Sequence, residues 1–318
     1  MLALGRDWSD TPSFFPEVSV EGTMEKRVFV SATTNKRLDE RRRLLKAAIL
    51  GKVRQAGYVP QEFWESGIPE NLSWSFENVD RVIRQCVGAV VFGFPRWTIS
   101  DASYETRLVG EFNHYEGAVA LTHGLPVLLL KEEGVEDRGV VWNGGGKTIT
   151  YVPEAADEKW VEGQDFAKRF NAWLRELGAR KDVFLGYCSK SAGTAAQIQL
   201  RLEKIGASVL NWAMDFRAGG SILSEVENAR AACSCGVFLF SEDDPLEGAP
   251  GVAAPRDNVV FEAGYFMSSK GPERCLIIRH GDAKMPADVG GAIYVHLAKS
   301  ADVSSIEGRL GDFIAKNL

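Results

Sequence analysis

The sequence has little of what marks secreted, membrane-spanning or nucleic-acid-binding proteins. Its 318 residues include only five cysteines, an odd number without a Cys-x-x-Cys pair, so neither a disulfide framework nor a metal site is expected. No run reaches about 18 apolar residues, so no membrane span is predicted. A formal net charge of −6 gives no support for direct nucleic-acid binding, which needs a broad basic surface.

Signals for targeting and for common nucleotide-binding loops are also missing. Residues 1–24 hold early charges and two prolines but no apolar signal-peptide core, so we expect a flexible tail on a protein of the reducing cytoplasm. No GxGxxG or GxxxxGK[ST] motif occurs, and VWNGGGKT (141–148) lacks the spacing of a phosphate loop and is predicted to be a turn. The densest basic run, Lys36–Lys46, has leucines at helical spacing and is interpreted as the solvated face of a helix.

Short apolar segments alternate with amphipathic ones from Arg27 onward, and the alternation restarts at Asp182. In the first half, strands are expected at 27–33, within 57–64, at 88–94 and at 125–130, and helices at 39–57, 74–86 and 105–124. In the second half, strands are expected at 182–187, 207–212, 235–241 and 274–279, and helices at 194–206, 222–233 and 258–271. Strand–helix alternation produces parallel sheets covered by helices. The sequence therefore predicts an α/β protein of two flavodoxin-like domains, each a mainly parallel sheet with helices on both faces.

The domain boundaries follow from the same pattern. The tail is 1–24, the first domain 25–150, and the second domain 181–318. Residues 151–180 are expected to hold a connecting helix, whose aromatic stripe from Trp160 to Trp173 is interpreted as packing.

Candidate ligand-binding residues of the second half lie directly after predicted strands, because ligands of open parallel sheets bind beyond the carboxyl ends of the strands. Ser189 and Ser191 open a helix and could hold a phosphate or ribose, although a simple helix cap at Ser191 explains them equally well. Trp212, Asp215 and Phe216 precede two glycines and are candidates for substrate binding, in which the two aromatic rings could stack on a base or pyridine ring; the alternative is a surface loop with anchored aromatics. The long Pro/Gly-rich loop 241–258, after the strand at 235–241, has the length of a lid, a binding loop or a disordered segment.

Glu262 is a single carboxylate among apolar neighbours in the helix PRDNVVFEAGYF. Burial raises the pKa of such a group unless a cation or a donor opposes it. From the residues alone, two interpretations stand: a buried ion pair with Arg256, Arg274 or Arg279, or a group used in chemistry.

Several motifs of the second half resemble a known family. DVFLGYCSKS, VLNWAMDFRAGGSI and CGVFLFS resemble the first half of a TIR domain. PRDNVVFEAGYFMSSKGPERCLII, followed by MPADVGGAIYVHL, is similar to bacterial TIR-like effectors of cyclic-nucleotide-triggered antiphage systems. The resemblance covers about 182–297, and Ala263 stands where the family has a larger aliphatic residue.

This resemblance implies an activity and its residues. The family cleaves the nicotinamide–ribose bond of NAD⁺, which makes NAD⁺ a substrate and requires no cofactor, and its helix glutamate corresponds to Glu262. Arg256, Asp257 and Asn258 of the same motif become candidates for substrate binding.

The first half resembles the nucleoside 2-deoxyribosyltransferase-like and TIR-like superfamily, on the segment GEFNHYEGAVALTHGLPVLLL. Glu116 takes the place there that Glu262 has in the second half, and both a ligand-holding and a catalytic role remain open. The residues expected to line the same edge are Ser31, Thr33, Arg96 and Asp101.

The leading hypothesis is an NAD⁺ nucleosidase effector of antiphage defence whose first domain senses a nucleotide signal or a partner and which assembles as a homo-oligomer on activation. An NAD⁺-cleaving enzyme is toxic to its own cell and must be inactive at rest, which is why the first domain is expected to be the sensor. Two alternatives are a non-catalytic adaptor that works through TIR assembly, and a nucleoside- or base-processing transferase acting through the first domain.

Overall fold

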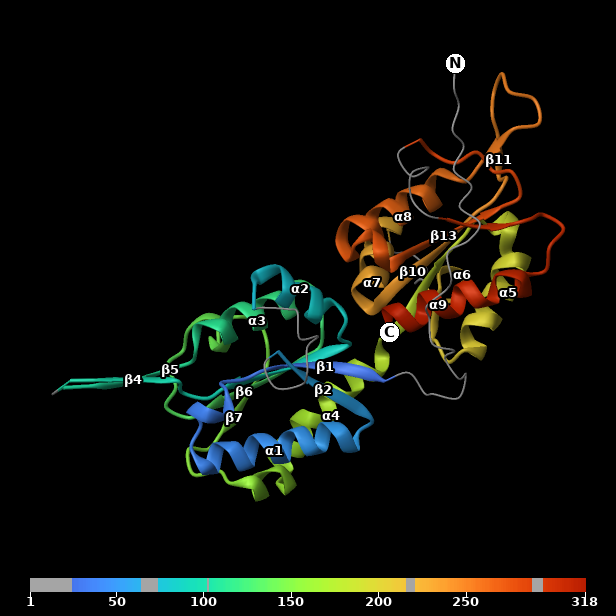
Figure 1. The fold of residues 1–318 in the computed structure, drawn as a ribbon. Helices are drawn as coiled ribbons and strands as arrows, with labels where there is room; N and C mark the ends of the chain where they lie inside the picture. Colours follow the sequence, from blue (N-terminus) through green and yellow to red (C-terminus); the bar gives the residue numbers. More distant parts are fainter. Residues whose placement is uncertain (1–24, 64–73, 102, 216–220, 288–293) are drawn as a thin grey trace, which may run out of the picture.

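The computed structural model describes residues 25–63, 74–101, 103–215, 221–287 and 294–318. It contains two α/β domains, each built on a parallel sheet of five strands (Figure 1). The predicted fold class is confirmed. Among the described residues, no helix has both the length and the apolar character that crossing a membrane requires.

The first sheet has the strand order β2-β1-β3-β6-β7, with all neighbouring strands parallel. The strands are β1 (Lys26–Ser31), β2 (Tyr58–Glu62), β3 (Gly88–Gly93), β6 (Val127–Glu132) and β7 (Ile149–Val152). β3 is buried along its whole length, as expected of a central strand covered on both faces.

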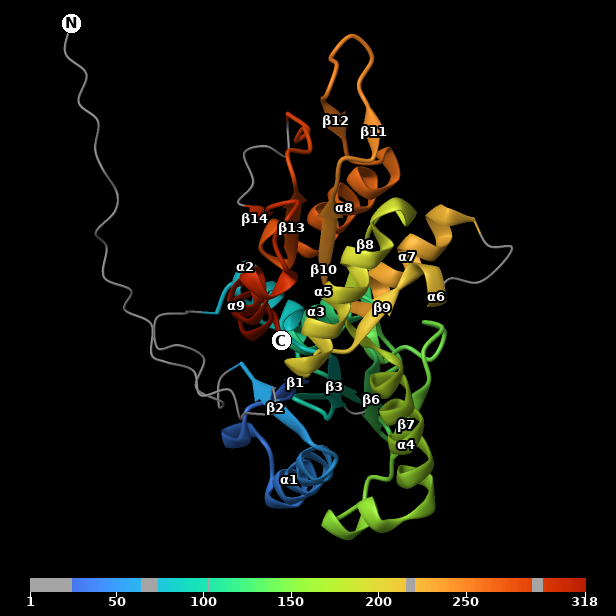
Figure 2. The ribbon, with the colours of Figure 1, turned by 90° about the vertical axis from the view of Figure 1, so that its right-hand side faces the viewer.

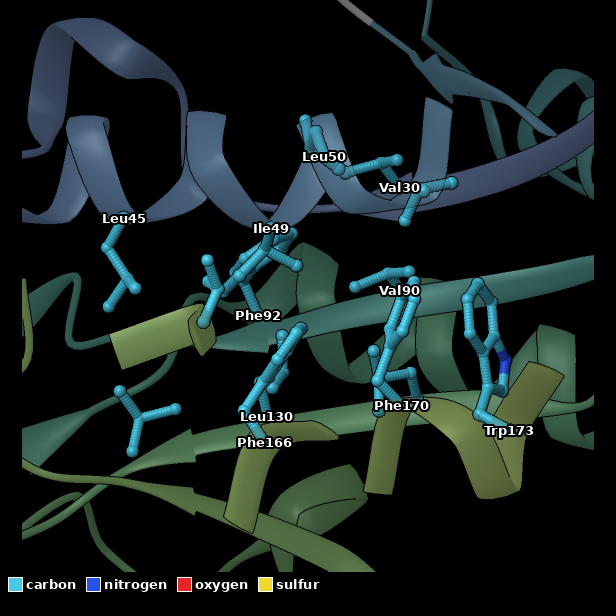
Figure 3. Close-up of a cluster of buried hydrophobic side chains, with 14 of the residues drawn as sticks. Val30, Leu45, Ile49, Leu50, Val90, Phe92, Leu130, Phe166, Phe170 and Trp173 are labelled. Carbon is cyan, nitrogen blue, oxygen red and sulfur yellow. The ribbon is translucent and has the colours of Figure 1, made fainter. Parts of the chain in front are cut away.

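Helices α1 (Glu40–Gln55) and α4 (Gln164–Ala179) cover one face of this sheet, while α2 (Phe76–Arg84) and α3 (Glu111–Thr122) cover the other. Asp39 caps α1 by accepting a hydrogen bond from the Arg42 amide. Figure 3 shows Leu45, Ile49 and Leu50 of α1 facing aromatic side chains of α4 across the residues of the strands.

The predicted connecting helix is part of the first domain. It divides into a short 3₁₀ turn (Glu158–Glu162) and α4. Phe166, Phe170 and Trp173 lie in the same buried cluster as Val90 of β3, and Trp173 donates its indole N–H to the Pro126 carbonyl. The apolar stripe therefore packs the sheet, as interpreted from the sequence.

The second sheet has the order β14-β13-β10-β8-β9, again all parallel. Its strands are β8 (Lys181–Gly186), β9 (Val209–Asn211), β10 (Cys233–Phe240), β13 (Cys275–His280) and β14 (Tyr294–Leu297). Helices α5 (Ala192–Lys204) and α9 (Glu307–Asn317) pack on one face, and α7 (Ile222–Ala232) and α8 (Asp257–Lys270) on the other. A short helix α6 (Trp212–Asp215) follows β9, and a small hairpin of β11 (Asp244–Pro245) and β12 (Ala253–Ala254) projects from the predicted lid loop (Figure 2).

The two domains repeat one arrangement. In spatial order, β2-β1-β3-β6-β7 matches β9-β8-β10-β13-β14, and the fifth strand of each sheet was not predicted from the sequence. The predicted helix at 105–124 is wrong at its start, because Glu105–Leu108 forms strand β5, antiparallel to β4 (Trp97–Ser100). This hairpin extends away from the body of the first domain (Figure 1).

The interpretation of the basic run as a solvated face is also corrected. Arg41 and Arg42 reach the fully buried carboxylate of Glu132 at the end of β6, with N–O distances of 3.0 and 2.6 Å. Lys46 is buried and pairs with Glu62. Several of these cations therefore hold α1 against the sheet.

Candidate functional site

Glu262 occupies the sixth position of α8, on the side of the helix that packs against the sheet. Val259, Ala263 and Phe266 of the same helix are buried in the core between α8 and the strands. The apolar spacing of this stripe orients α8, and Glu262 lies within it with only 7% of its surface exposed. The fold thus carries a carboxylate into an apolar layer.

The structure excludes the buried ion pair that the sequence left open. Oε2 of Glu262 is buried and has no hydrogen-bond partner among the residues that the structure describes, and desolvation raises the pKa of this carboxyl to about 7. Arg274 and Arg279 instead donate to backbone carbonyls, and Arg256 pairs with Asp244 at 3.0 Å. Glu262 is therefore an uncompensated buried carboxylate, which is the kind of group found at functional sites.

Gly186, at the end of β8, leaves the space beside this carboxylate. A Cβ atom at that position would lie 2.9 Å from Glu262 Oε2 and still closer to the Phe238 ring. Sequence reasoning missed this residue, although a glycine at the carboxyl end of a buried strand is a signal of close approach.

The other motif residues lie around the entrance of α8. Arg256 is the N-cap residue, and Asp257 and Asn258 are exposed in the first turn. The backbone N–H of Arg256 donates to Asp243 in the predicted lid loop. The motif therefore ties the lid loop to the helix that carries Glu262, with Asn258 one turn before the carboxylate.

Ser189 and Ser191 lie at the start of α5. Ser191 is buried and donates to the Cys188 carbonyl, whereas Ser189 is exposed. Ser191 lines a cavity of about 190 Å³ with Lys190, Ser241 and His280. Glu262 is not among the described residues that line this cavity.

Trp212 is half-buried and packs against both cores of the second domain, and its indole N–H donates to the Tyr187 carbonyl. The side chain of Asp215 and the whole of Phe216 lie outside the part of the chain that the structure describes. The predicted substrate-binding role of these three residues, with ring stacking by Trp212 and Phe216, stays a prediction.

The first domain holds a second buried carboxylate at the equivalent position. Glu116 is the sixth residue of α3, as Glu262 is of α8, and desolvation raises its pKa to about 7. Unlike Glu262, Glu116 is fixed by hydrogen bonds: Ser31 donates to Glu116 Oε2 at 2.6 Å, and Asn113 donates to Ser31 at 3.0 Å. Ser31 and Gly186 are each the sixth residue of equivalent strands, so the hydroxyl that fixes Glu116 has no counterpart beside Glu262 at this strand position.

A cavity of about 40 Å³ adjoins Glu116 and is lined by Thr33, Arg96, Phe112 and Asn113 among others. Within the described part of the chain, the buried atoms Thr33 Oγ1 and Arg96 Nε have no hydrogen-bond partners. Ser31, Thr33, Arg96 and Glu116 therefore come together as predicted, and Asn113 joins them as a residue that sequence reasoning missed.

Asp101 does not join this group, which corrects the prediction. It lies in the turn of the β4–β5 hairpin, where it accepts hydrogen bonds from Ser103. The sequence pattern placed it on a strand-end loop, but the hairpin carries it away from the sheet edge.

Residues 182–299 match the family model described as CAP12/Pycsar effector protein, TIR domain. The second domain is a TIR domain of this kind. The resemblance drawn from its motifs is confirmed, while the match does not extend to the first domain, whose resemblance stays a prediction.

Curated relatives support the same assignment. CD-NTase-associated protein 12 of Sphingobacterium faecium is 28% identical over 115 residues, 35% of each chain. CD-NTase-associated protein 12 of a Lachnospiraceae bacterium is 32% identical over 111 residues, 34% of this chain and 35% of that protein. The Pycsar effector protein BcPycTIR of Burkholderia cepacia is 35% identical over 136 residues, 40% of this chain and 45% of that protein. The matches thus span less than half of each relative.

Proposed function

We propose that the TIR domain cleaves the nicotinamide–ribose bond of NAD⁺ and that Glu262 is the catalytic residue. The observation that carries the proposal is the buried, unpartnered carboxylate of Glu262 inside the segment that matches the effector family. The family description and the name of the Burkholderia cepacia relative both contain the word effector, and we extend to this chain the role of an effector in antiphage defence.

Cleavage of this bond requires little from the protein beyond a carboxylate in apolar surroundings. The bond from ribose C1′ to the pyridinium nitrogen breaks with its electron pair moving to nicotinamide, which leaves as a neutral molecule. Positive charge then develops on the ribose, and a nearby carboxylate stabilises this oxocarbenium-like transition state. Water adds at C1′ and releases a proton, so the products are ADP-ribose, nicotinamide and H⁺.

We further propose that the described arrangement is a resting state. Glu262 Oε2 is closed to solvent, so a substrate reaches it only after neighbouring groups move. The first domain offers the control element, because its cavity beside Glu116 carries unpartnered polar atoms of Thr33 and Arg96 that suit a nucleotide-like signal. Binding there would trigger assembly into a homo-oligomer and open the TIR site.

The test is to incubate the purified full-length protein with NAD⁺ and candidate nucleotides and to separate the products by chromatography. Glu262→Gln keeps the size of the side chain and removes its charge, so nicotinamide release should fall to background while the fold is kept. Glu116→Gln is the matched control, because it changes the equivalent carboxylate of the first domain. It should alter the response to a nucleotide and leave the chemistry of the TIR site in place.

The outcomes separate the alternatives. Nicotinamide release by Glu262→Gln at the wild-type rate would exclude the proposed mechanism. If the defence response were the same with Glu or Gln at position 262, the protein would be a non-catalytic adaptor. Loss of all activity in Glu116→Gln with Glu262→Gln unaffected would assign the chemistry to the first domain, as a transferase.

A further inference from the structure

The two helices that carry the buried glutamates end at the same place between the domains. α3 ends at Thr122 with His123 as its C-cap residue, and α8 ends at Lys270. Both His123 and Lys270 line one small cavity, to which Arg84 of α2 and Arg180 at the junction of the domains also contribute.

The domains contact each other closely around this cavity. Arg180 donates from Nη1 to the Ala231 carbonyl of the second domain at 2.7 Å and to the Gly124 carbonyl of the first at 3.4 Å. Lys26 of β1 forms an ion pair with the buried Asp182 of β8. The cavity is therefore part of the junction itself.

The lining of the cavity is strongly basic. Besides the three cations Arg84, Arg180 and Lys270 and the imidazole of His123, it contains Cys86, Leu125 and Ser234, and none of these described lining residues is acidic. The Arg274 guanidinium is buried close by and donates to the Ser234 carbonyl.

The cations around the cavity differ in whether they have acceptors among the described residues. The Asp80 carboxylate contacts both Arg84 Nε and His123 Nε2, with N–O distances of 2.7 and 2.6 Å. Lys270 is only 8% exposed, and among the described residues no acceptor binds its ammonium group; Arg180 Nε is likewise buried without a partner. The C-terminal dipoles of α3 and α8 favour cations here but supply only partial charges. A buried ammonium group without an acceptor is costly, so this site lacks a negative group.

We propose that the cavity binds a small monovalent inorganic anion of the size of chloride, held by Lys270, Arg84 and Arg180. The cavity measures about 10 Å³, which is room for roughly one water-sized particle. A phosphate group or a nucleotide is too large for it. The anion completes the coordination of Lys270 and neutralises the repulsion among the cations.

The surrounding charges agree with this assignment. The pKa of Lys270 is lowered to about 7, first by burial and then by the charges of Arg180, Arg230 and Arg274. A bound anion favours the charged form of Lys270 and so raises its pKa, which offsets the effects of burial and of the neighbouring cations. Lys270 then stays charged at neutral pH. The anion thereby bridges the first domain to α8, the helix of Glu262.

The experiment compares thermal unfolding of the full-length protein in sodium chloride and in sodium gluconate at equal ionic strength, below pH 7. Gluconate is too large for the cavity. Chloride should therefore raise the Tm of the wild type by roughly 2–4 °C relative to gluconate. Lys270→Met should lose this difference, and Arg84→Gln should reduce it. Lys168→Met, at an exposed position of α4, is the matched control and should keep it.

Crystals grown with bromide provide a direct check, since bromide replaces chloride and scatters anomalously. An anomalous peak between Lys270 and Arg84 supports the site. Equal Tm values of the wild type in the two salts, an undiminished chloride effect in Lys270→Met, or bromide peaks only elsewhere would each overturn the proposal.

Discussion

Two buried glutamates at equivalent positions differ in what surrounds them. Glu116 is fixed by Ser31, whereas Glu262 lies beside Gly186 with Oε2 unpartnered. Both carboxyls have their pKa raised to about 7 by burial, so both pockets favour the protonated form. Of the two, only the Glu262 carboxylate has no donor among the described residues, and a buried group in that condition costs stability, a cost that a functional role would explain.

The raised pKa of Glu262 predicts how stability depends on pH. Its folded value of about 7 lies above the ordinary 4.5, so the folded state holds the proton more tightly than the unfolded state. The stabilisation is fully present below about pH 4.5 and is lost as pH rises to 7. Glu262→Gln never ionises, so above pH 7 it should be more stable than the wild type by roughly 1–3 kcal/mol.

Urea denaturation of the wild type and the variant at pH 5 and pH 8 measures this effect. The stability advantage of Glu262→Gln should grow between the two pH values. Glu176→Gln, at an exposed position of α4, is the control and should show a flat difference. An advantage of Glu262→Gln that is the same at both pH values would contradict the assignment of a raised pKa.

Among the secondary-structure elements, α1 is held by charges as well as by its apolar face. Arg41 and Arg42 of α1 converge on the fully buried Glu132 of β6, and Arg107 of β5 lies 3.8 Å from it. Glu132→Ala leaves these guanidinium groups without their buried partner. It should lower the free energy of unfolding by about 3–5 kcal/mol.

Glu133→Ala provides the control, because Glu133 is the exposed neighbour of Glu132 in the sequence. Chemical denaturation should find that variant within about 0.5 kcal/mol of the wild type. If Glu132→Ala were as stable as Glu133→Ala, the arginines would be adequately solvated without the carboxylate, and the basic run would be a solvated face after all.

The elements that the sequence predicted well are those with a local signal. Buried strands such as β3 and β10 are continuous apolar runs, and the apolar stripe of α8 has the spacing of a helix, so these elements and the position of Glu262 follow from short segments. Strand β5 was taken into a helix because its character depends on pairing with β4.

Long-range side-chain pairs were beyond the local pattern. The bond from Ser31 to Glu116 joins residues 85 positions apart, and it was anticipated only as proximity at one sheet edge. The contact of Arg42 with Glu132 spans 90 positions and was missed, because charge spacing within a helix says nothing about its distant partners. The prediction that Asp101 lines the sheet edge was wrong for the same reason, because the β4–β5 hairpin depends on pairing that the local sequence does not show.

Across the whole molecule, the repeated sheets place the two carboxylates on equivalent helices whose C-terminal ends meet at the junction of the domains. The C-cap residue of α3 and the last residue of α8 line the same cavity, together with Arg84 and Arg180. A change at the Glu116 cavity that displaced α3 would therefore act on the surroundings of α8. The proposed control of the TIR site by the first domain requires such a physical link between two sites.

The same arrangement predicts how activity depends on protein concentration. Because Glu262 Oε2 is closed to solvent in the single chain, NAD⁺ can contact this oxygen only after its surroundings reorganise, and we expect contacts between copies to stabilise the open form. Specific activity of the full-length protein should therefore rise steeply with protein concentration or with an activating nucleotide, together with a rise in mass by light scattering.

Glu116→Gln should shift the nucleotide concentration needed for this rise, while Glu262→Gln should assemble normally without releasing nicotinamide. A monomer whose specific activity is constant across a wide concentration range would contradict control by assembly and would leave the first domain with another role, most simply a second catalytic site at Glu116.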